Sequence, residues 1–98
     1  MDAGVAVNDA RHRFEHDVDG HVAFLDYRLE EDRLTLVHTE VPEALGGRGL
    51  GAKLVSAALA YAKENGLTVV PQCSYVRSYL ERKPEAAAGI TVADPEDG

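Results

Sequence analysis

The first half of the chain alternates between apolar and polar residues with a period of two, as strands do when they bury one face. Three such runs occupy residues 11–18, 21–29 and 33–41. Asp19 and Gly20 form a strong two-residue turn signal between the first two runs, and an acidic turn separates the second run from the third. The pattern predicts three antiparallel strands joined by tight turns.

The first and third runs differ in what their faces can bury. Residues 11–18 hold only two large apolar residues, Phe14 and Val18, so we expect a weak strand at the edge of the sheet. In the third run, strict alternation predicts that His38 and Glu40 share one face near the end of the strand. That face carries Leu34, Leu36, His38 and Glu40, and the other carries Thr35, Val37, Thr39 and Val41.

In the second half of the chain the apolar spacing becomes that of helices. Pro42 ends the third strand because its nitrogen cannot donate a hydrogen bond to a sheet. Apolar residues at helical spacing predict a helix over residues 48–65, which Gly66 ends. These residues are Leu50, Leu54, Ala57, Ala58 and Tyr61, with Val55 and Leu59 widening the stripe.

The remaining residues predict one more strand and one more helix. A short apolar run over residues 67–71 is typical of a buried strand, and a second helix is expected over residues 74–83. The small, acidic residues 86–98 have little to bury, so we expect a loosely ordered tail. The chain is therefore expected to form a single domain over residues 1–98, with its core within residues 11–85.

The expected order of elements is β-β-β-α-β-α, an α/β (α+β) arrangement. The strand, helix and strand in its second half have the order of a right-handed crossover between parallel strands. We therefore predict a mostly antiparallel sheet with one parallel βαβ crossover.

Charge and cysteine content limit the classes of function. The chain has 98 residues, with 10 basic and 17 acidic side chains and a net charge of −7, which disfavours non-specific binding to nucleic acid or to an anionic membrane. One cysteine, Cys73, excludes an internal disulfide framework and a multi-cysteine zinc site, and we expect no metal. No apolar run approaches the length of a membrane span, and no secretory signal is visible, so a cytoplasmic location is expected.

A glycine-rich stretch, L-G-G-R-G-L-G, occupies residues 45–51 directly ahead of the first predicted helix. Such a cluster is either a flexible turn or an anion cradle, in which bare backbone N–H groups face a phosphate at the positive end of the helix dipole. The stretch follows the carboxyl end of a strand, where open α/β sheets bind ligands, and this favours the cradle. It lacks the Gly-Lys-Ser/Thr ending of a Walker loop, and the three preceding antiparallel strands disfavour a dinucleotide-binding unit.

Three segments together resemble the GNAT N-acetyltransferase superfamily, specifically its small, minimal branch. They are a strand ending in H-T-E-V-P, the loop G-G-R-G-L-G-A-K-L that opens a helix, and a short strand ending in V-V-P-Q-C-S-Y-V. The resemblance covers about residues 12–85. The loop pattern of the superfamily is Gln/Arg-x-x-Gly-x-Gly/Ala; Gly49 and Gly51 match its small positions, whereas Gly46 departs from its leading position.

The resemblance implies that backbone amides of the loop hold the pyrophosphate of acetyl-CoA. The implied cofactor-binding residues are Gly46, Gly47, Arg48, Gly49, Leu50 and Gly51, followed by Ala52 and Lys53. The end of the third strand, at Thr39, Glu40 and Val41, would lie beside the pantetheine arm. The side chains of Arg48 and Lys53 either add charge near the phosphates or are solvated residues of the helix.

Four side chains are candidates for the chemistry of acetyl transfer. His38 or Glu40 could accept the proton of the amine, directly or through water, although a histidine in a strand also has ordinary structural roles. Tyr79 could protonate the departing thiolate, as the resemblance implies for a tyrosine on the last helix, or it could pack in the core. Cys73 lies at the start of that helix, where a thiol pKa is lowered, so it could accept the acetyl group or line the pocket as a small hydrophobe.

The function expected from these observations is transfer of acetyl from acetyl-CoA to an unidentified amine, on a small molecule or on a protein, by a monomer or a homodimer. The first alternative is a module that binds CoA or acetyl-CoA without turnover. The second is an interaction domain that binds no CoA, in which the glycine stretch is only a turn.

Overall fold

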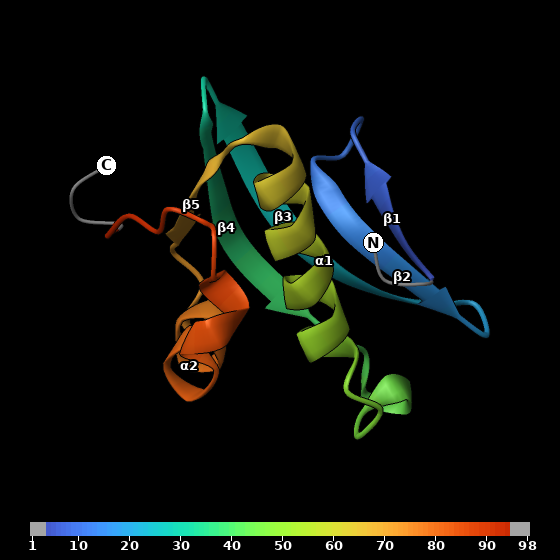
Figure 1. The fold of residues 1–98 in the computed structure, drawn as a ribbon. Coiled ribbons are helices and arrows are strands. Elements are labelled where there is room, and N and C mark those ends of the chain that lie inside the picture. The colour runs from blue at the N-terminus through green and yellow to red at the C-terminus, as the bar shows by residue number, and fades with distance from the viewer. Residues whose placement is uncertain (1–3, 95–98) are drawn as a thin grey trace.

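A five-stranded sheet organises the molecule, with its strands in the spatial order β1-β2-β3-β4-β5 (Figure 1). The computed structural model describes residues 4–94. The strands β1 to β4 pair with one another in antiparallel order, and β5 pairs with β4 in parallel. This arrangement confirms the predicted sheet with its βαβ crossover. The strands are β1 (Val5–Asn8), β2 (Arg13–Val18), β3 (His21–Glu30), β4 (Arg33–Glu40) and β5 (Thr68–Pro71), and the helices are α1 (Leu50–Asn65) and α2 (Ser74–Arg82), with short 3-10 turns η1 (Glu43–Leu45) and η2 (Pro84–Ala87).

The strand β1 was not expected from the sequence. It pairs with β2 along its whole length, so β2 is not the edge strand that its composition suggested, and the element order is β-β-β-β-α-β-α. Four residues are too few to display a convincing alternation, and only Val5 is fully buried. Its partner strand buries Phe14 completely, because the neighbours on both sides shelter that side chain.

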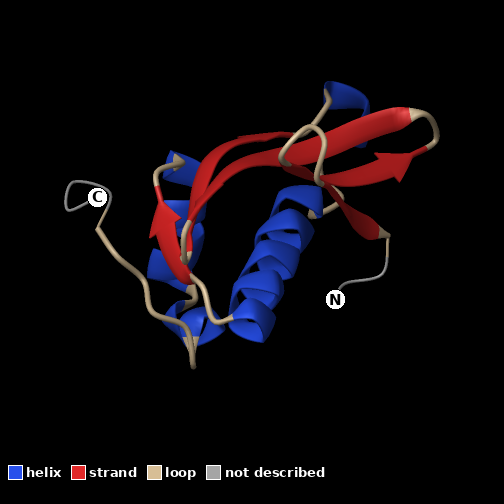
Figure 2. Ribbon diagram, turned by 90° about the horizontal axis from the view of Figure 1, so that it is seen from above, coloured by secondary structure: helices blue, strands red, loops and turns tan. Residues whose placement is uncertain are grey.

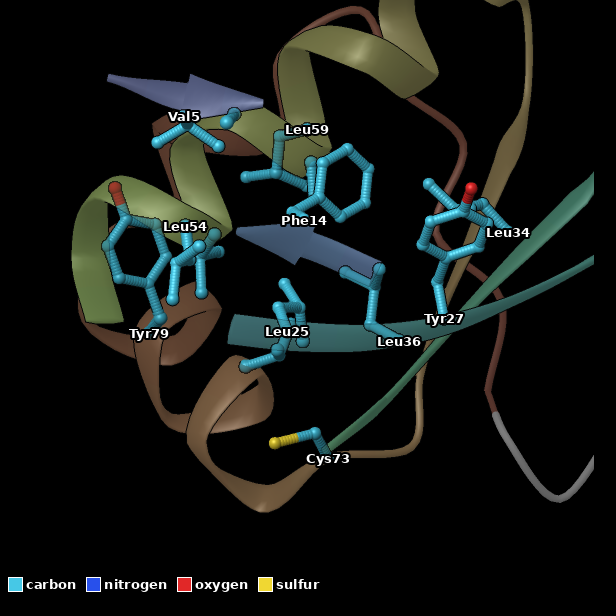
Figure 3. Packing of buried hydrophobic residues seen from close by; sticks show 14 of the residues in the cluster. Val5, Phe14, Leu25, Tyr27, Leu34, Leu36, Leu54, Leu59, Cys73 and Tyr79 are labelled. Atoms are coloured by element: carbon cyan, nitrogen blue, oxygen red, sulfur yellow. The ribbon is translucent and has the colours of Figure 1, made fainter. Parts of the chain in front are cut away.

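Both helices lie on one side of the sheet and cover a single core (Figure 2). Phe14 is central to this core, as Figure 3 shows. The centroid of its ring lies 5.1 Å from that of Tyr27 and 5.5 Å from that of Tyr61. Val76 and Tyr79 of α2 join the same cluster. No helix of the described residues 4–94 covers the other face of the sheet, as antiparallel sheets allow when that face is polar.

A β-bulge in β4 changes which side chains face the core. The pairs that flank it are Leu25–Thr39, Asp26–His38 and Tyr27–Leu36, which leaves Val37 as an extra residue. An extra residue reverses the alternation beyond it, so Thr39 lies on the core side with Leu36. His38 and Glu40 do share a face, as predicted, but that face is the open one, and the predicted grouping of both residues with Leu36 is wrong.

The chain after α2 differs from the expected loose tail over residues 86–94. Ala86 and Ile90 pack partly buried against the core. The backbone of Val69 in β5 bonds to the segment around Val92, donating to the carbonyl of Thr91 at 2.8 Å and accepting from the N–H of Ala93 at 2.9 Å. This segment therefore covers the outer edge of β5. The rest of the expected tail, residues 95–98, lies outside the described residues.

Candidate cofactor and acetyl-transfer site

The glycine stretch turns the chain from β4 into α1 and leaves the start of that helix uncapped. Gly47 and Gly49 have positive φ angles of 79° and 69°, and Gly49 is the N-cap residue, without a side-chain hydrogen bond to the helix. Left-handed backbone of this kind favours glycine because a Cβ is strained there. The first N–H groups of a helix have no partner within it, so they are available to an anion.

The structure separates the predicted amide donors into two groups. The N–H of Gly46 donates to the carbonyl of Glu43 at 3.0 Å, and the N–H of Lys53 donates to the carbonyl of Gly49 at 3.2 Å, so these two amides are engaged. Within residues 4–94 no hydrogen-bond partner is recorded for the intervening N–H groups, those of Gly47, Arg48, Gly49, Leu50, Gly51 and Ala52. The side chains of Arg48 and Lys53 are exposed beside them.

A cavity of about 390 Å³ opens at this helix terminus. Its wall runs from the end of β4 through the glycine stretch to the start of α2, and it is lined by Val41, Pro42, Glu43, Leu45, Gly46, Gly47, Gly49, Leu50, Gly51 and Tyr75. The start of α1 and Tyr75, in the first turn of α2, therefore line the same cavity. The cavity brings together the loop and the strand end that the sequence assigned to the cofactor.

Tyr75 also lines this cavity, although from the sequence it was expected only as a residue of the second helix. A Cβ at Gly51 would lie 2.8 Å from the hydroxyl and from the adjacent ring carbon of Tyr75, closer than side chains tolerate. The absence of a side chain at Gly51 thus makes room for the ring of Tyr75. A glycine in the first turn of a helix was the available signal, but its partner lies 24 positions away in the sequence and only the fold reveals it.

The strands β4 and β5 part next to this cavity. Their parallel pairing ends at Leu36 and Pro71, while β4 continues to Glu40. The N–H of Cys73 donates to the carbonyl of Leu36 at 2.8 Å, and Cys73 is then the N-cap residue of α2. Beyond this point the segment after β5 contacts β4 through side chains, because the hydroxyl of Thr39 and the thiol of Cys73 lie 3.5 Å apart.

The surroundings of Cys73 lower the pKa of its thiol. Burial acts in the opposite direction and is the largest single influence, but the hydroxyl of Thr39 and the backbone N–H groups of Val76, Tyr75 and Thr39 together outweigh it. These donors stabilise the thiolate, as does the positive end of α2. The predicted location of Cys73 at a helix N-terminus is confirmed, because it is the N-cap residue of α2.

The two candidate bases lie on the opposite face of β4. Nε2 of His38 is 3.3 Å from Oε1 of Glu40, and both side chains are more than half exposed. The imidazole also meets the ring of Phe24 edge-on at a centroid distance of 6.2 Å. The structure therefore brings His38 and Glu40 together with each other, but not with Cys73.

Tyr79 does not lie at the start of α2, where Cys73 is. It is six residues further along, about 9 Å at the rise of an α-helix, and its ring is buried in the core beside Leu54 of α1 (Figure 3). The structure thus places Tyr79 in the core, and its role as a proton donor stays a prediction.

The described residues 4–94 contain neither a cluster of metal-binding side chains nor a helix able to cross a membrane. No group of three or more histidine, cysteine, aspartate or glutamate side chains is placed to hold a metal ion there. None of the helices in that part of the chain has the length and apolar character needed to cross a membrane.

The antiparallel sheet with a parallel last strand that parts from its neighbour, and the uncapped start of α1 beside that point, agree with the fold that the resemblance in the sequence implies. A sequence profile described as GCN5-related N-acetyltransferase matches residues 13–89. The solution structure of a GCN5-like N-acetyltransferase candidate from Staphylococcus aureus is similar, with a TM-score of 0.69 and 25% identity over 94% of this chain and 93% of that one. The chain belongs to the GCN5-related N-acetyltransferase family, which confirms the resemblance seen in the sequence.

Matches to vertebrate proteins cover a smaller part of this chain. The protein NATD1 of chicken and that of mouse are each 41% identical to this chain over 49 residues. The matched stretch covers 50% of this chain and 44% of each relative, so the match spans less than half the length of those proteins.

Proposed function

We propose that this chain binds acetyl-CoA and transfers its acetyl group to an amine. The observation that carries the proposal is the uncapped start of α1, where Gly47, Gly49, Leu50 and Gly51 line a cavity between the end of β4 and the start of α2. Membership of the GCN5-related N-acetyltransferase family supports the same cofactor. The acceptor is an amine on a small molecule or on a protein.

The residues present fit the pyrophosphate of this cofactor. Free backbone N–H groups and the positive helix end together attract an anion, and the glycines let its oxygens approach the backbone closely. Exposed Arg48 and Lys53 add positive charge at the same place. Val41, which also lines the cavity, is two residues along the chain from Thr39, whose hydroxyl lies 3.5 Å from the thiol of Cys73. The proposal therefore places the acetyl end of the ligand on the side of Val41 and the thiol.

Acetyl-CoA would supply an activated acetyl thioester at this position. In the covalent route, the Cys73 thiolate forms a bond to the acetyl carbon and the thiolate of CoA leaves; the amine then displaces Cys73 from the acetyl group and loses a proton. In the direct route, the amine displaces the CoA thiolate itself, and Cys73 only lines the pocket. The hydroxyl of Thr39 and the nearby backbone N–H groups would stabilise the thiolate in the first route.

His38 and Glu40 are the proposed acceptors of the amine proton. Both are exposed on the open face of β4, one residue on either side of Thr39. An amine that approaches from that face would meet a carboxylate and an imidazole before it reaches the gap between the strands. The hydrogen-bonded pair can pass the proton to solvent, directly or through water.

The second candidate function is a module that binds CoA without turnover. Tyr79 is buried away from the start of α2, and the two candidate bases face away from Cys73. An acceptor pocket is therefore less clearly formed than the cofactor cavity. Binding and turnover need separate tests.

The binding test uses two glycines with the same backbone geometry at opposite ends of α1. Gly49 and Gly66 cap this helix with φ angles of 69° and 64°, and a Cβ at either position meets nothing within 4 Å. Alanine at each costs a similar backbone strain of about 1–2 kcal/mol. Only Gly49→Ala disturbs the amide cradle, so we expect it to weaken calorimetric binding of CoA about tenfold or more, a loss of about 1.4 kcal/mol. Gly66→Ala is the matched control for stability and should bind like the wild type.

Equal affinities of the two variants would show that these glycines form only turns, and absence of CoA binding by the wild type would exclude both candidate functions. The turnover test follows acetyl transfer from acetyl-CoA to a panel of amines with wild type and Cys73→Ala. Mass spectrometry of the protein after mixing with acetyl-CoA identifies an acetyl group on Cys73. Binding without transfer to any amine, and without acetylation, would support the binding module instead.

A further inference from the structure

We propose that a second cavity, next to the first, binds the 3′-phosphorylated end of CoA, and that Arg82 and Lys83 hold this phosphate. The inference rests on the acetyl-CoA-binding function proposed above and deepens it. It names the side chains that would distinguish CoA from the same molecule without its 3′-phosphate.

The second cavity has a volume of about 200 Å³ and is lined by Ala52, Tyr75, Tyr79, Arg82 and Lys83. Tyr75 also lines the first cavity, together with Gly51, the residue just before Ala52. The two cavities therefore share the ring of Tyr75 as a wall and begin at consecutive residues of α1. A ligand held by the free amides at the start of α1 has a path past this ring into the second cavity.

The spacing of residues along α2 explains why the end of this path at Arg82 is positively charged. Tyr75, Tyr79 and Arg82 are spaced at i, i+4 and i+7, so they lie along one face of the helix. Seven residues at the rise of an α-helix separate Tyr75 from Arg82 by about 10 Å. That length is comparable to a ribose with phosphates at both ends. Arg77, at i+2 from Tyr75, lies on another face of the same helix.

Positive charge is concentrated around the two cavities. Residues 46–53 and 72–83, which supply most of the lining of the two cavities, contain five of the ten lysine and arginine residues of the chain and one of its seventeen acidic residues; Glu43, which also lines the first cavity, is a second acidic residue there. In a protein with a net charge of −7, such local excess directs an anionic ligand to this surface. A nucleotide with a pyrophosphate and an additional phosphate monoester carries negative charge at both ends of the path. One end would lie near Arg48 and Lys53, and the other near Arg82 and Lys83.

The two proposed phosphate ligands are available for this role. Among the described residues, neither Arg82 nor Lys83 forms an ion pair. Nε of Arg82 donates a long hydrogen bond of 3.4 Å to the carbonyl of Ser78, which leaves its terminal nitrogens available. The Lys83 ammonium lies 5.8 Å from the centre of the Tyr79 ring. An arginine fork and a lysine point charge are the usual partners of a phosphate monoester.

The experiment compares calorimetric binding of CoA and of 3′-dephospho-CoA. We expect the wild type to prefer CoA by about tenfold, the scale of one or two charge-assisted contacts to a partly exposed phosphate. The variant Arg82→Ala/Lys83→Ala should lose this preference and keep its affinity for 3′-dephospho-CoA. Arg77→Ala removes one positive charge from another face of α2 and should keep the preference; it is compared with the single variants Arg82→Gln and Lys83→Gln. The exchange Arg82→Lys/Lys83→Arg keeps both charges and should restore most of it.

The outcomes separate the inference from the function on which it rests. If the wild type binds CoA and 3′-dephospho-CoA equally, or if Arg77→Ala lowers the preference as much as the double variant does, the assignment of the phosphate to Arg82 and Lys83 is wrong while cofactor binding stands. If the wild type binds neither molecule, the proposed function itself fails. Circular dichroism melting of each variant checks the fold, and the single variants Arg82→Gln and Lys83→Gln replace the double variant if it melts early.

Discussion

The hydroxyl oxygen of Thr39 lies 3.5 Å from the sulfur of Cys73, although 34 residues separate them in the sequence. This contact joins the end of β4 to the N-cap of α2 across the point where β4 and β5 part. It depends on the bulge at Val37, because without the extra residue Thr39 would face the open side of the sheet. One inserted residue in a strand thus places a hydroxyl against the only thiol of the chain.

Replacing Thr39 by valine is expected to raise the pKa of Cys73. The substitution keeps the shape of the side chain but removes a hydrogen bond that favours the thiolate, while the opposing effect of burial remains. The rate of Cys73 alkylation by iodoacetamide, measured from pH 5 to pH 10, should follow a titration curve moved to higher pH. Thr35→Val makes the same change at another buried position of β4 and is the control. Identical curves for Thr39→Val and wild type would contradict the role of this hydroxyl.

Removing either member of the His38–Glu40 pair is expected to leave stability almost unchanged. The two side chains are 56% and 60% exposed, and an ion pair of that kind contributes at most about 1 kcal/mol. Glu40→Gln and His38→Ala should therefore melt within a few degrees of the wild type. If these residues accept the amine proton, kcat should fall by about a hundredfold or more, the usual contribution of a general base. Unchanged kcat in both variants would exclude that role.

Tyr27 is expected to make the fold sensitive to alkaline pH. Burial, followed by the charge of Asp9 and the hydrogen bond that the phenol donates to its carboxylate at 3.2 Å, raises the pKa of Tyr27 to about 12. A phenol whose pKa is higher in the folded state than in the unfolded state stabilises the fold fully below pH 10. That stability is lost as pH rises from about 10 through about 12.

The measurement for Tyr27 is the free energy of unfolding in urea at intervals between pH 9 and pH 12. Tyr27→Phe should show a shallower loss than the wild type over this range, because it has no phenol to ionise. Asp9→Asn, which removes the carboxylate but keeps the phenol, should give an intermediate slope. A wild type and a Tyr27→Phe variant that lose stability in parallel would show that this phenol is not responsible.

Phe14 is expected to be among the most important residues for stability. Its side chain is completely buried and contacts the rings of Tyr27 and Tyr61, so alanine leaves a cavity between β2, β3 and α1. Phe14→Ala should lower the free energy of unfolding by about 3–5 kcal/mol. Leu29→Ala, at a side chain that is 44% exposed, should change it by about 0.5 kcal/mol or less. Urea titration of both variants measures the difference.

Much of the fold follows from local patterns in the sequence. The alternation of residues 21–29 and 33–41, the Asp19-Gly20 turn and the helical stripe after Gly49 each specify an element that the structure contains within a few residues. Local geometry dictates these elements, because the period of the apolar residues and the conformations open to glycine and proline act within a few positions. For the same reason the glycine stretch revealed the start of α1.

The site depended on relationships that no local pattern contains. The strand β1 is stable only because β2 pairs with it, and the bulge at Val37 is set by the pairing of β4 with β3 rather than by any residue type. The contacts of Gly51 with Tyr75 and of Thr39 with Cys73 form when α2 folds back against α1 and β4. The sequence by itself determined the strands β2 to β5, both α-helices and the glycine-rich start of α1. Only the tertiary structure decided which side chains meet, because those contacts join residues far apart in the chain, and a shift of one residue in a strand changes the face on which each of them lies.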